Sequence, residues 1–283
     1  MATTLETPTR PQAPAQGAPA GADLRHDLRA AVRVVRVALP AFNEGESLPR
    51  LLDSLHASLS AAGLAHEIVV VDDGSSDDTA EIASRASFSM PVRLVQHEHN
   101  QGLAAALRTG LVDAVRHAAP GDVVITMDSD NTHPAGLIPR MLSLVDEGHD
   151  VVIASRFRPG SRVIGVPLDR VLLSVAARWV FKAVLPIPGV RDYTCGFRAY
   201  RVGPLAAAID LYGDRFVSEA GFSCMVDVLL KLRGLRLDGR PLVMGEAPMV
   251  LRYDQKGGAS KMRVLRTVRQ TLSLVVRRRL RGA

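Results

Sequence analysis

The sequence predicts an α/β protein in which a mainly parallel central sheet carries helices on both faces. Short apolar runs rich in Val and Ile alternate with longer segments in which apolar residues recur at helical spacing. Repeated strand and helix units of this length build a parallel sheet, because each helix returns the chain across one face of the sheet. Polar motifs follow several of the apolar runs, and ligands bind such sheets at the carboxyl ends of the strands.

The first strand and helix have the clearest pattern. A strand is predicted over residues 34–39, ending at Pro40, and a helix over residues 47–62 with Ser47 as its candidate N-cap. Five leucines recur at helical spacing in that helix: Leu48, Leu51, Leu52, Leu55 and Leu59. The alternation continues with predicted strands at residues 67–71, 92–95, 123–127 and 151–154, and predicted helices at residues 78–86, 102–117 and 134–147.

Length and composition favour one domain over residues 31–260. A chain of 283 residues with 47% apolar side chains can bury one large core. Residues 1–30 are rich in Pro, Ala, Thr, Gln and Gly, so we expect a disordered tail. We expect a cytoplasmic protein, because the sequence contains neither a secretory signal nor an uncharged apolar run of about 18 residues. Cys195 and Cys224 are far apart, which is typical of reduced structural thiols.

The net charge of +6 comes from the C-terminal segment. Residues 261–283 contain eight basic and no acidic side chains, whereas residues 1–260 contain 27 basic and 29 acidic ones, a balance of −2. Apolar residues recur at helical spacing between those charges, which predicts a basic amphipathic helix. Such a helix can lie on an anionic membrane, or it can pack on the core with its basic end in solvent. Nucleic-acid binding is disfavoured, since only 4% of residues are aromatic and no reading motif is present.

Four polar motifs stand where predicted strands end. They are Asn43-Glu44, Asp72-Asp73-Gly74-Ser75, Asp128-Ser129-Asp130 and Ser155-Arg156. We expect them to converge on one edge of the sheet. Asp128 and Asp130 suit a divalent metal that holds a diphosphate, which makes a nucleotide-sugar enzyme the first hypothesis. Taken alone, each acidic motif is equally typical of a loop or a helix cap.

Together these residues resemble the family 2 glycosyltransferases of the GT-A fold, and within them the dolichol- or polyprenol-phosphate mannosyltransferase group. The matching segments are residues 39–44, 70–77, 100–102, 127–134, 154–157 and 192–201, with Arg252, Ser260 and Lys261. They span nearly the whole predicted domain. The resemblance implies a catalytic domain that transfers a hexose, first of all mannose from GDP-mannose, to a polyprenyl or dolichyl phosphate with inversion at the anomeric carbon.

On the donor side, the resemblance implies a nucleotide pocket and a metal site. The metal, Mg²⁺ or Mn²⁺, would bind at Asp128 and Asp130 and offset the charge on the leaving diphosphate. Asp130 is also a catalytic candidate. Phe42 stands where the family usually has Tyr. The residues matched to the nucleotide pocket are Pro40, Phe42, Glu44, Asp72 and Gly102.

On the acceptor side, cations are needed rather than a base. A phosphate monoester has a second pKa of about 6 and is already anionic at neutral pH. The resemblance matches Arg156, Arg170 and Ser174 to residues that bind the lipid phosphate. Arg198, Arg252 and Lys261 are further candidates for phosphate contacts near the reacting centre, with Arg156 and Arg198 counted as catalytic. For any one arginine the alternative is an ordinary surface ion pair.

The most apolar stretch is residues 171–188, which contains the only Trp of the chain. Arg178 and Lys182 share one helix face, while Leu172, Leu173 and Trp179 spread over the others. We interpret it as an interfacial helix that guides a polyisoprenoid tail toward the acceptor site. The alternative is a buried helix that covers the sheet.

The resemblance also implies a peripheral protein at the cytosolic face of the membrane, with any integral membrane partner supplied by a separate chain. The sequence departs from the family at Met225 and Asp227, where Gln and Glu are frequent. Alternatives are UDP-glucose or UDP-N-acetylglucosamine as donor, a sugar-1-phosphate nucleotidyltransferase, or an inactive scaffold that binds a sugar nucleotide. The nucleotidyltransferase would need a Gly-rich basic loop after the first strand, where this sequence has Pro40-Ala41-Phe42-Asn43-Glu44.

Overall fold

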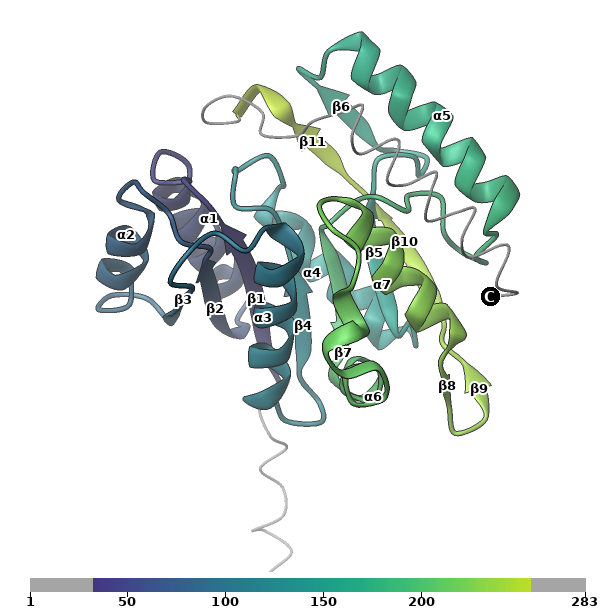
Figure 1. The fold of residues 1–283 in the computed structure, drawn as a ribbon, viewed down its shortest axis with the longest axis horizontal. Helices are drawn as coiled ribbons and strands as arrows, with labels where there is room; N and C mark the ends of the chain where they lie inside the picture. The colour runs from purple at the N-terminus through teal and green to yellow at the C-terminus, as the bar shows by residue number, and fades with distance from the viewer. Residues whose placement is uncertain (1–32, 256–283) are drawn as a thin grey trace, which may run out of the picture. The chain divides into compact units, whose positions relative to one another are not determined.

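The computed structural model describes residues 33–255, which contain a seven-stranded central sheet (Figure 1). The strand order is β10-β5-β7-β4-β1-β2-β3. Every neighbouring pair is parallel except those of β7, which runs antiparallel to both β4 and β5. The strands are β1 (Val34–Ala41), β2 (Ala65–Asp72), β3 (Val92–Gln96), β4 (Val123–Thr126), β5 (Val151–Ser155), β7 (Arg198–Arg201) and β10 (Met244–Pro248). The predicted mainly parallel sheet is confirmed.

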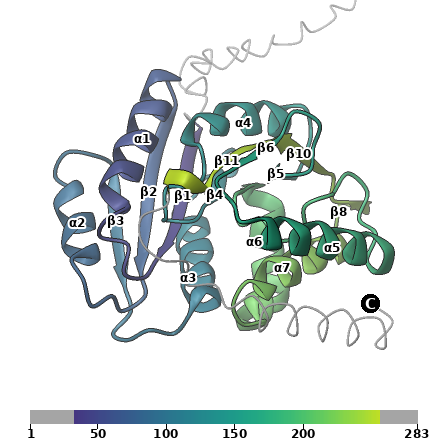
Figure 2. The ribbon, with the colours of Figure 1, turned by 90° about the horizontal axis from the view of Figure 1, so that it is seen from above.

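Helices cover both faces of this sheet (Figure 2). One face carries α1 (Leu48–Ala61), α2 (Thr79–Ala86), the 3₁₀ turn η1 (Ala135–Leu137) and α4 (Ile138–Asp146). The other face carries α3 (Leu103–Arg116), α6 (Val202–Tyr212), the 3₁₀ turn η2 (Gly213–Val217) and α7 (Ser223–Gly234). The five leucines of α1 are all buried, as their spacing predicts, and they pack against the apolar side chains of the sheet.

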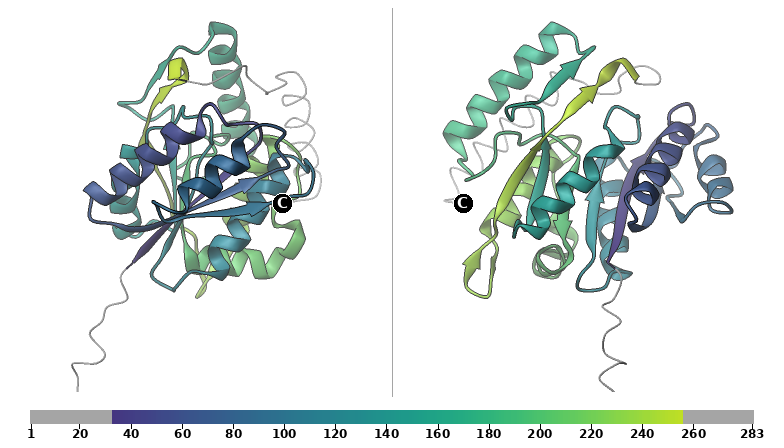
Figure 3. Two further views of the ribbon diagram at one scale, coloured as in Figure 1. Left: turned by 90° about the vertical axis from the view of Figure 1, so that its left-hand side faces the viewer. Right: turned by 180° about the vertical axis from the view of Figure 1, so that it is seen from behind.

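A smaller layer lies beyond the carboxyl ends of the parallel strands (Figures 1 and 3). It consists of β6 (Arg162–Ile164), α5 (Leu168–Val184) and β11 (Val250–Arg252), and we call it the outer layer. β6 and β11 pair in parallel, and the 3₁₀ turn η3 (Tyr253–Gln255) follows β11. A short hairpin of β8 (Arg236–Leu237) and β9 (Arg240–Pro241) precedes β10. Within residues 33–255, no helix combines the length and apolar content that crossing a bilayer requires.

Several predicted boundaries need correction. β1 does not end at Pro40 but continues to Ala41. Pro40 fits there because β4 pairs with β1 only as far as Ala38, so no strand on that side needs a proline N–H. Ser47 makes no capping hydrogen bond. The predicted helix over residues 134–147 is divided into η1 and α4, and the apolar helix spans Leu168–Val184 rather than residues 171–188.

The predicted tails are not part of the described structure. The expected disordered segment of residues 1–30, the expected basic helix of residues 261–283 and Lys261 all lie outside residues 33–255.

Asp150 fixes the amino end of β5 to the segment before β10. Its buried carboxylate accepts hydrogen bonds from the Val243 N–H (2.8 Å) and from both terminal nitrogens of Arg240 (2.7 and 3.1 Å). Burial opposes the charge, but the Arg240 and Val243 donors outweigh it and hold the pKa of Asp150 below its ordinary 3.8. The ionised carboxylate is therefore the form that stabilises the fold.

We expect Asp150→Asn to lower the free energy of unfolding by about 1–3 kcal/mol at pH 7, because a charged acceptor of three hydrogen bonds is lost. The wild-type advantage is fully present above the unfolded pKa of 3.8 and disappears as the pH falls through the lower folded pKa. Urea denaturation of both proteins at pH 7 and pH 3 measures this. A difference that is equally large at both pH values would contradict the assignment.

Candidate active site

The polar motifs converge on one edge of the sheet, as predicted, because β1, β2, β4 and β5 all end there. Asp72 at the end of β2 is 1% exposed. One carboxylate oxygen of Asp72 accepts the Ser75 N–H (3.1 Å), and the other accepts the side-chain amide of Gln96 at the end of β3 (3.3 Å). Asp72 therefore closes the turn after β2.

The loops after β1 and β2 are tied to each other. The Asn43 N–H donates to Ser75 Oγ (2.9 Å), and Asn43 Oδ1 accepts the Ser76 N–H (2.8 Å). Asn43 has a φ of 52°, a left-handed conformation that Asn tolerates better than most residues. Phe42 and Glu44 flank Asn43 and are partly buried. These predicted pocket residues therefore lie on a loop that is held by the hydrogen bonds of Asn43.

Asp73 organises the segment that leads into α3. It accepts hydrogen bonds from the Gln101 N–H (3.0 Å), the Gly102 N–H (2.7 Å) and His97 Nδ1 (2.7 Å). A Cβ on Gly74 would come within 2.5 Å of the His99 carbonyl carbon, so this segment lies directly on the Gly74 turn. Gly102, the remaining predicted pocket residue, is thereby brought beside the turn that follows Asp72.

Asp128 and Asp130 follow β4 and are both partly exposed, whereas Ser129 between them is buried. The Ser129 hydroxyl donates to the Pro40 carbonyl (2.8 Å), which fixes the triplet to β1. Asp130 Oδ1 accepts the Thr132 hydroxyl (2.7 Å) and N–H (3.2 Å). The buried middle residue is thus an anchor between two carboxylates that remain partly exposed.

His133 lies behind Asp128 and is stacked on Phe197, with ring centroids 5.3 Å apart. His133 Nδ1 lies 3.4 Å from the Asp128 nitrogen, and Nε2 lies 3.9 Å from Asp128 Oδ2. Within residues 33–255, no group of three or more His, Cys, Asp or Glu side chains is placed to hold a metal by itself. Two carboxylates fit a Mg²⁺ or Mn²⁺ ion that takes its other oxygen ligands from a substrate diphosphate and water.

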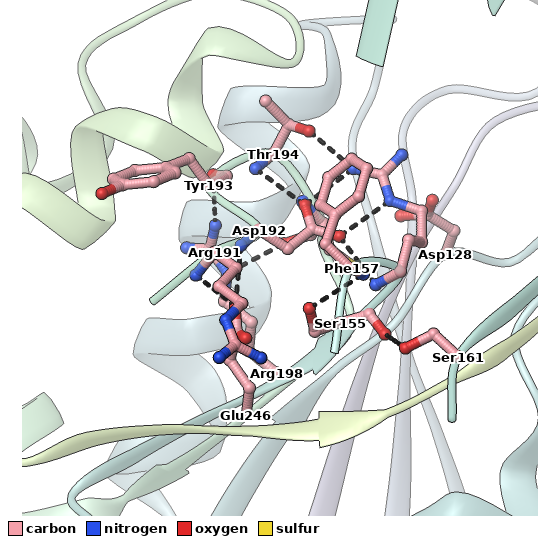
Figure 4. A network of polar contacts seen from close by, with 12 residues as sticks. Asp128, Ser155, Phe157, Ser161, Arg191, Asp192, Tyr193, Thr194, Arg198 and Glu246 are labelled. Atoms are coloured by element: carbon pink, nitrogen blue, oxygen red, sulfur yellow. Dashed lines mark hydrogen bonds and ion pairs between the residues drawn. The ribbon is translucent and has the colours of Figure 1, made fainter. Parts of the chain in front are cut away.

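Arg156, directly after β5, forms an ion pair with the buried Asp192. Figure 4 shows Asp192 among its neighbours. The N–H, Nε and one terminal nitrogen of Arg156 all donate to the Asp192 carboxylate (3.0, 2.8 and 2.7 Å), and that terminal nitrogen also donates to Thr194 Oγ1 (2.7 Å). Burial opposes both charges, but their mutual attraction prevails, so the pKa of Arg156 is raised and that of Asp192 is lowered. The negative charge of Asp128 adds to the rise.

The geometry of Arg156 leaves one of its terminal guanidinium nitrogens able to donate a hydrogen bond to a ligand. Its side chain is 19% exposed, and within the described residues its second terminal nitrogen makes no hydrogen bond. That nitrogen is fixed in direction by the other two, since a guanidinium is planar. Arg156 is thus a preorganised cation beside Asp128.

Arg198 does not have the role predicted for it. It is fully buried, and its three guanidinium nitrogens donate to the carbonyls of Cys195 (2.8 Å), Met225 (2.7 Å) and Tyr193 (2.9 Å). With every nitrogen satisfied and none exposed, Arg198 cannot contact a phosphate in this conformation. Its role is to bind the loop before β7 to α7.

Arg170 and Ser174 lie one turn apart near the start of α5, and both are partly exposed. Arg170 donates to the Tyr253 hydroxyl (2.7 Å), and its guanidinium carbon is 5.8 Å from the centre of that ring. Tyr253 thereby joins α5 to the segment after β11. No local pattern predicts this contact, because it joins residues 83 positions apart in the chain.

Arg252, at the end of β11, is hydrogen-bonded to the loop that follows the acidic triplet. Its N–H donates to the Thr132 carbonyl (3.0 Å), and its guanidinium pairs with Asp254 (2.8 Å). The backbone bond places β11 over the loop that carries Asp130. The side chain, in contrast, makes the exposed ion pair that was the alternative for any one arginine.

The arrangement brings two carboxylates and one fixed guanidinium to the same edge of the sheet. Arg170 and Ser174 lie on the adjacent outer layer, and Asp72, Phe42 and Glu44 lie in the loops after β1 and β2. Such a site can hold a diphosphate through a metal on one side and a second anion through arginine on the other. Asp192 lies in one of the matching segments, but its role as partner of Arg156 was not predicted. Tyr253, His97 and Glu246 were not predicted as site residues either, because their contacts join distant parts of the chain.

Comparison with known structures agrees with this fold. Glucosyl-3-phosphoglycerate synthase from Mycobacterium tuberculosis, crystallised with Mn²⁺, UDP and glucosyl-3-phosphoglycerate, superposes with a TM-score of 0.59 at 22% identity. The superposition covers 88% of this chain and 80% of that one. The expected GT-A fold is confirmed.

Three curated relatives are similar in sequence. Dolichol-phosphate mannosyltransferase from Pyrococcus furiosus is 32% identical over 212 residues, covering 75% of this chain and 56% of that protein. Polyprenol monophosphomannose synthase from Mycolicibacterium smegmatis is 36% identical over 194 residues, 68% of this chain and 69% of that protein. Undecaprenyl-phosphate 4-deoxy-4-formamido-L-arabinose transferase from Salmonella paratyphi A is 34% identical over 174 residues, 61% of this chain and half of that protein.

The alignments thus span about half the length of two of these relatives and somewhat more than two thirds of the other. The profile of glycosyl transferase family 2 matches residues 36–207, which extend from within β1 to beyond β7 and include both acidic motifs. The chain therefore belongs to glycosyl transferase family 2.

Proposed function

We propose that this chain transfers a hexose from a nucleoside diphosphate to a polyprenyl phosphate, with inversion at the anomeric carbon. The observation that carries the proposal is the juxtaposition of Asp128 with the preorganised guanidinium of Arg156. GDP-mannose is the first donor to test, because two of the similar proteins are named for a mannosyl product. UDP-glucose and UDP-N-acetylglucosamine remain alternative donors.

The acceptor chemistry follows from the cations. A phosphate monoester is anionic at neutral pH, so its oxygen can attack the anomeric carbon without a general base. Arg156, with one directed donor, and Arg170 and Ser174 on α5 would hold that phosphate. The names of the three relatives refer to dolichol, polyprenol or undecaprenyl compounds, which supports a polyprenyl carrier. One in-line displacement opposite the leaving diphosphate inverts the centre.

The donor chemistry follows from the carboxylates. Asp128 and Asp130 would hold Mg²⁺ or Mn²⁺, which stabilises the negative charge that develops on the leaving nucleoside diphosphate. Phe42 and Glu44, which are partly exposed, would contact the nucleoside, and the buried Asp72 would hold the adjoining turn in place. Ser129 fixes the triplet to β1. A nucleotidyltransferase is not favoured, since the loop after β1 contains Asn43 and Glu44 rather than a basic Gly-rich sequence.

α5 supports a peripheral membrane location. Leu168 is 81% exposed, Leu172 69% and Trp179 57%, so the alternative of a buried covering helix does not fit. Arg178 and Lys182 lie over the Trp179 ring at 5.4 and 5.6 Å, an arrangement suited to a lipid headgroup region. We infer that this helix lies on the cytosolic face of a membrane and admits the lipid toward Arg170. An integral membrane partner would be a separate chain.

The first test is transfer of radiolabelled sugar from GDP-mannose, and from UDP-glucose in parallel, to chloroform-extractable polyprenyl phosphate. Asp130→Asn should reduce the rate by about 100-fold or more, because charge stabilisation in the transition state is lost. EDTA should abolish transfer, and added Mn²⁺ or Mg²⁺ should restore it. Asp53→Asn, an exposed carboxylate on α1, is the control and should leave the rate unchanged. Unchanged transfer by Asp130→Asn would rule out the proposed metal site.

The membrane proposal is tested by sedimentation with vesicles of phosphatidylcholine and phosphatidylglycerol. Trp179→Glu should weaken vesicle binding by about tenfold or more, since burying an aromatic side chain contributes roughly 1.5–3 kcal/mol. Phe88→Glu is the matched control, because Phe88 is 88% exposed but follows α2, away from the outer layer. Equal losses in the two variants would mean that α5 has no special role at the membrane.

A further inference from the structure

Glu246 is a buried carboxyl group that the proposed chemistry does not use. It lies on β10 and is 4% exposed. Its Oε1 accepts two backbone hydrogen bonds, from the N–H groups of Arg191 (2.5 Å) and Asp192 (2.7 Å). Figure 4 shows Glu246 below Asp192 in the same network. One carboxyl oxygen thus accepts hydrogen bonds from two consecutive N–H groups of the loop before β7.

A second contact fastens this loop to the same strand. Gly189 has a φ of 80°, and a Cβ there would come within 2.3 Å of the Met244 carbonyl oxygen. The loop therefore lies against the backbone of β10 at Met244 and against its side chain at Glu246. The Glu246 side chain orients residues 191 and 192 by accepting their N–H groups, because buried N–H groups require a hydrogen-bond partner.

The orientation of Asp192 determines that of Arg156. Asp192 is fully buried and receives three hydrogen bonds from Arg156, in addition to N–H groups of Thr194 (3.3 Å) and Cys195 (3.2 Å). A rotation of the Asp192 backbone would move the acceptor that fixes the Arg156 guanidinium. Misplacement of a reacting group's partner by about 1 Å can cost about 100-fold in rate.

The surroundings of Glu246 favour a neutral carboxylic acid, which can accept the two backbone N–H groups without adding a charge. Within the described residues its buried Oε2 accepts no hydrogen bond of good geometry, although the Ser155 hydroxyl lies nearby, and this arrangement disfavours a carboxylate. Burial raises the pKa of Glu246 and the nearby Asp192 charge adds to the rise, while the two N–H donors and the Ser155 hydroxyl offset only part of it. A neutral group also leaves the Asp192 charge to pair with Arg156 alone.

We propose that Glu246 is a positioning residue for the acceptor phosphate: it fixes the Asp192 backbone, and through Asp192 it directs the free nitrogen of Arg156. The role in acceptor binding rests on the proposed function. The positioning of Arg156 does not, so the two parts can fail separately.

The test compares Glu246→Ala and Glu246→Gln with Asp150→Asn. Glu246→Ala removes both backbone contacts and should raise the KM for farnesyl phosphate, a short polyprenyl phosphate, by about 10- to 100-fold. The KM for the sugar nucleotide should change by less than about threefold, because Asp128 and Asp130 belong to a different loop. Glu246→Gln keeps a neutral acceptor at the same place and should restore a nearly wild-type KM. Glu246→Asp, one methylene shorter, replaces the Ala variant if that protein does not fold.

Asp150→Asn is the matched control. Asp150 is a buried carboxylate that also binds a backbone N–H beside β10, but it lies at the amino end of β5 and makes no contact with Asp192. It should lose stability without a change in the KM for farnesyl phosphate. An equal rise in that KM for Asp150→Asn and Glu246→Ala would mean that general destabilisation causes the effect and would overturn the proposal.

A second readout does not depend on turnover. In protein labelled with ¹⁵N-arginine, the Nε–H signal of Arg156, assigned by its loss in Arg156→Lys, should be sharp in the wild type and in Glu246→Gln. It should broaden or shift in Glu246→Ala. An unmoved signal in Glu246→Ala would overturn the positioning role. A shifted signal together with absence of farnesyl phosphate binding to the wild type would uphold positioning and instead refute the proposed acceptor.

Discussion

The site depends on the buried pair of Arg156 and Asp192. Removing two charges from water is costly, and their attraction compensates only when the geometry is good and other hydrogen bonds complete the pair. Asp192 meets that condition, since its two oxygens accept five N–H donors, three from Arg156 and two from Thr194 and Cys195 in its own loop. The pair therefore holds the end of β5 to the loop before β7. It also leaves a guanidinium nitrogen at the site whose direction is set before any ligand arrives.

The antiparallel strand β7 makes this pairing possible. It lies between β4, which leads into Asp128, and β5, which leads into Arg156. Because β7 runs opposite to both neighbours, the loop that precedes it reaches the same edge of the sheet as the ends that follow them. Asp192 and Thr194 enter the site on that loop. Arg198, buried at the start of β7, keeps the loop in place by binding three of the surrounding carbonyls.

Sequence patterns predicted the βα units well and the site only in part. The strands around Val37, Val70 and Ile125 are short, mostly apolar runs with turn or helix signals next to them. Their positions could therefore be predicted, and with them the convergence of the polar motifs. β7 was not predicted, because a strand of four residues that includes a buried Arg198 lacks an apolar pattern. Motif position also suggested a phosphate contact for Arg198. Only the fold reveals that its partners are backbone carbonyls.

The departures from the family pattern on α7 have different consequences. Asp227 accepts the Ser218 N–H (3.0 Å) and hydroxyl (2.9 Å) and pairs with Lys231 (2.6 Å) one turn later, so its charge is balanced within α7 and η2. Met225 is closer to the chemistry. A Cβ on Gly196 would lie 3.1 Å from Met225 Cε and 3.0 Å from Asp128 Oδ1, so a larger residue there would require these side chains to shift. Met225 therefore packs against the loop that passes beside Asp128, whereas Asp227 supports the helix that carries Met225.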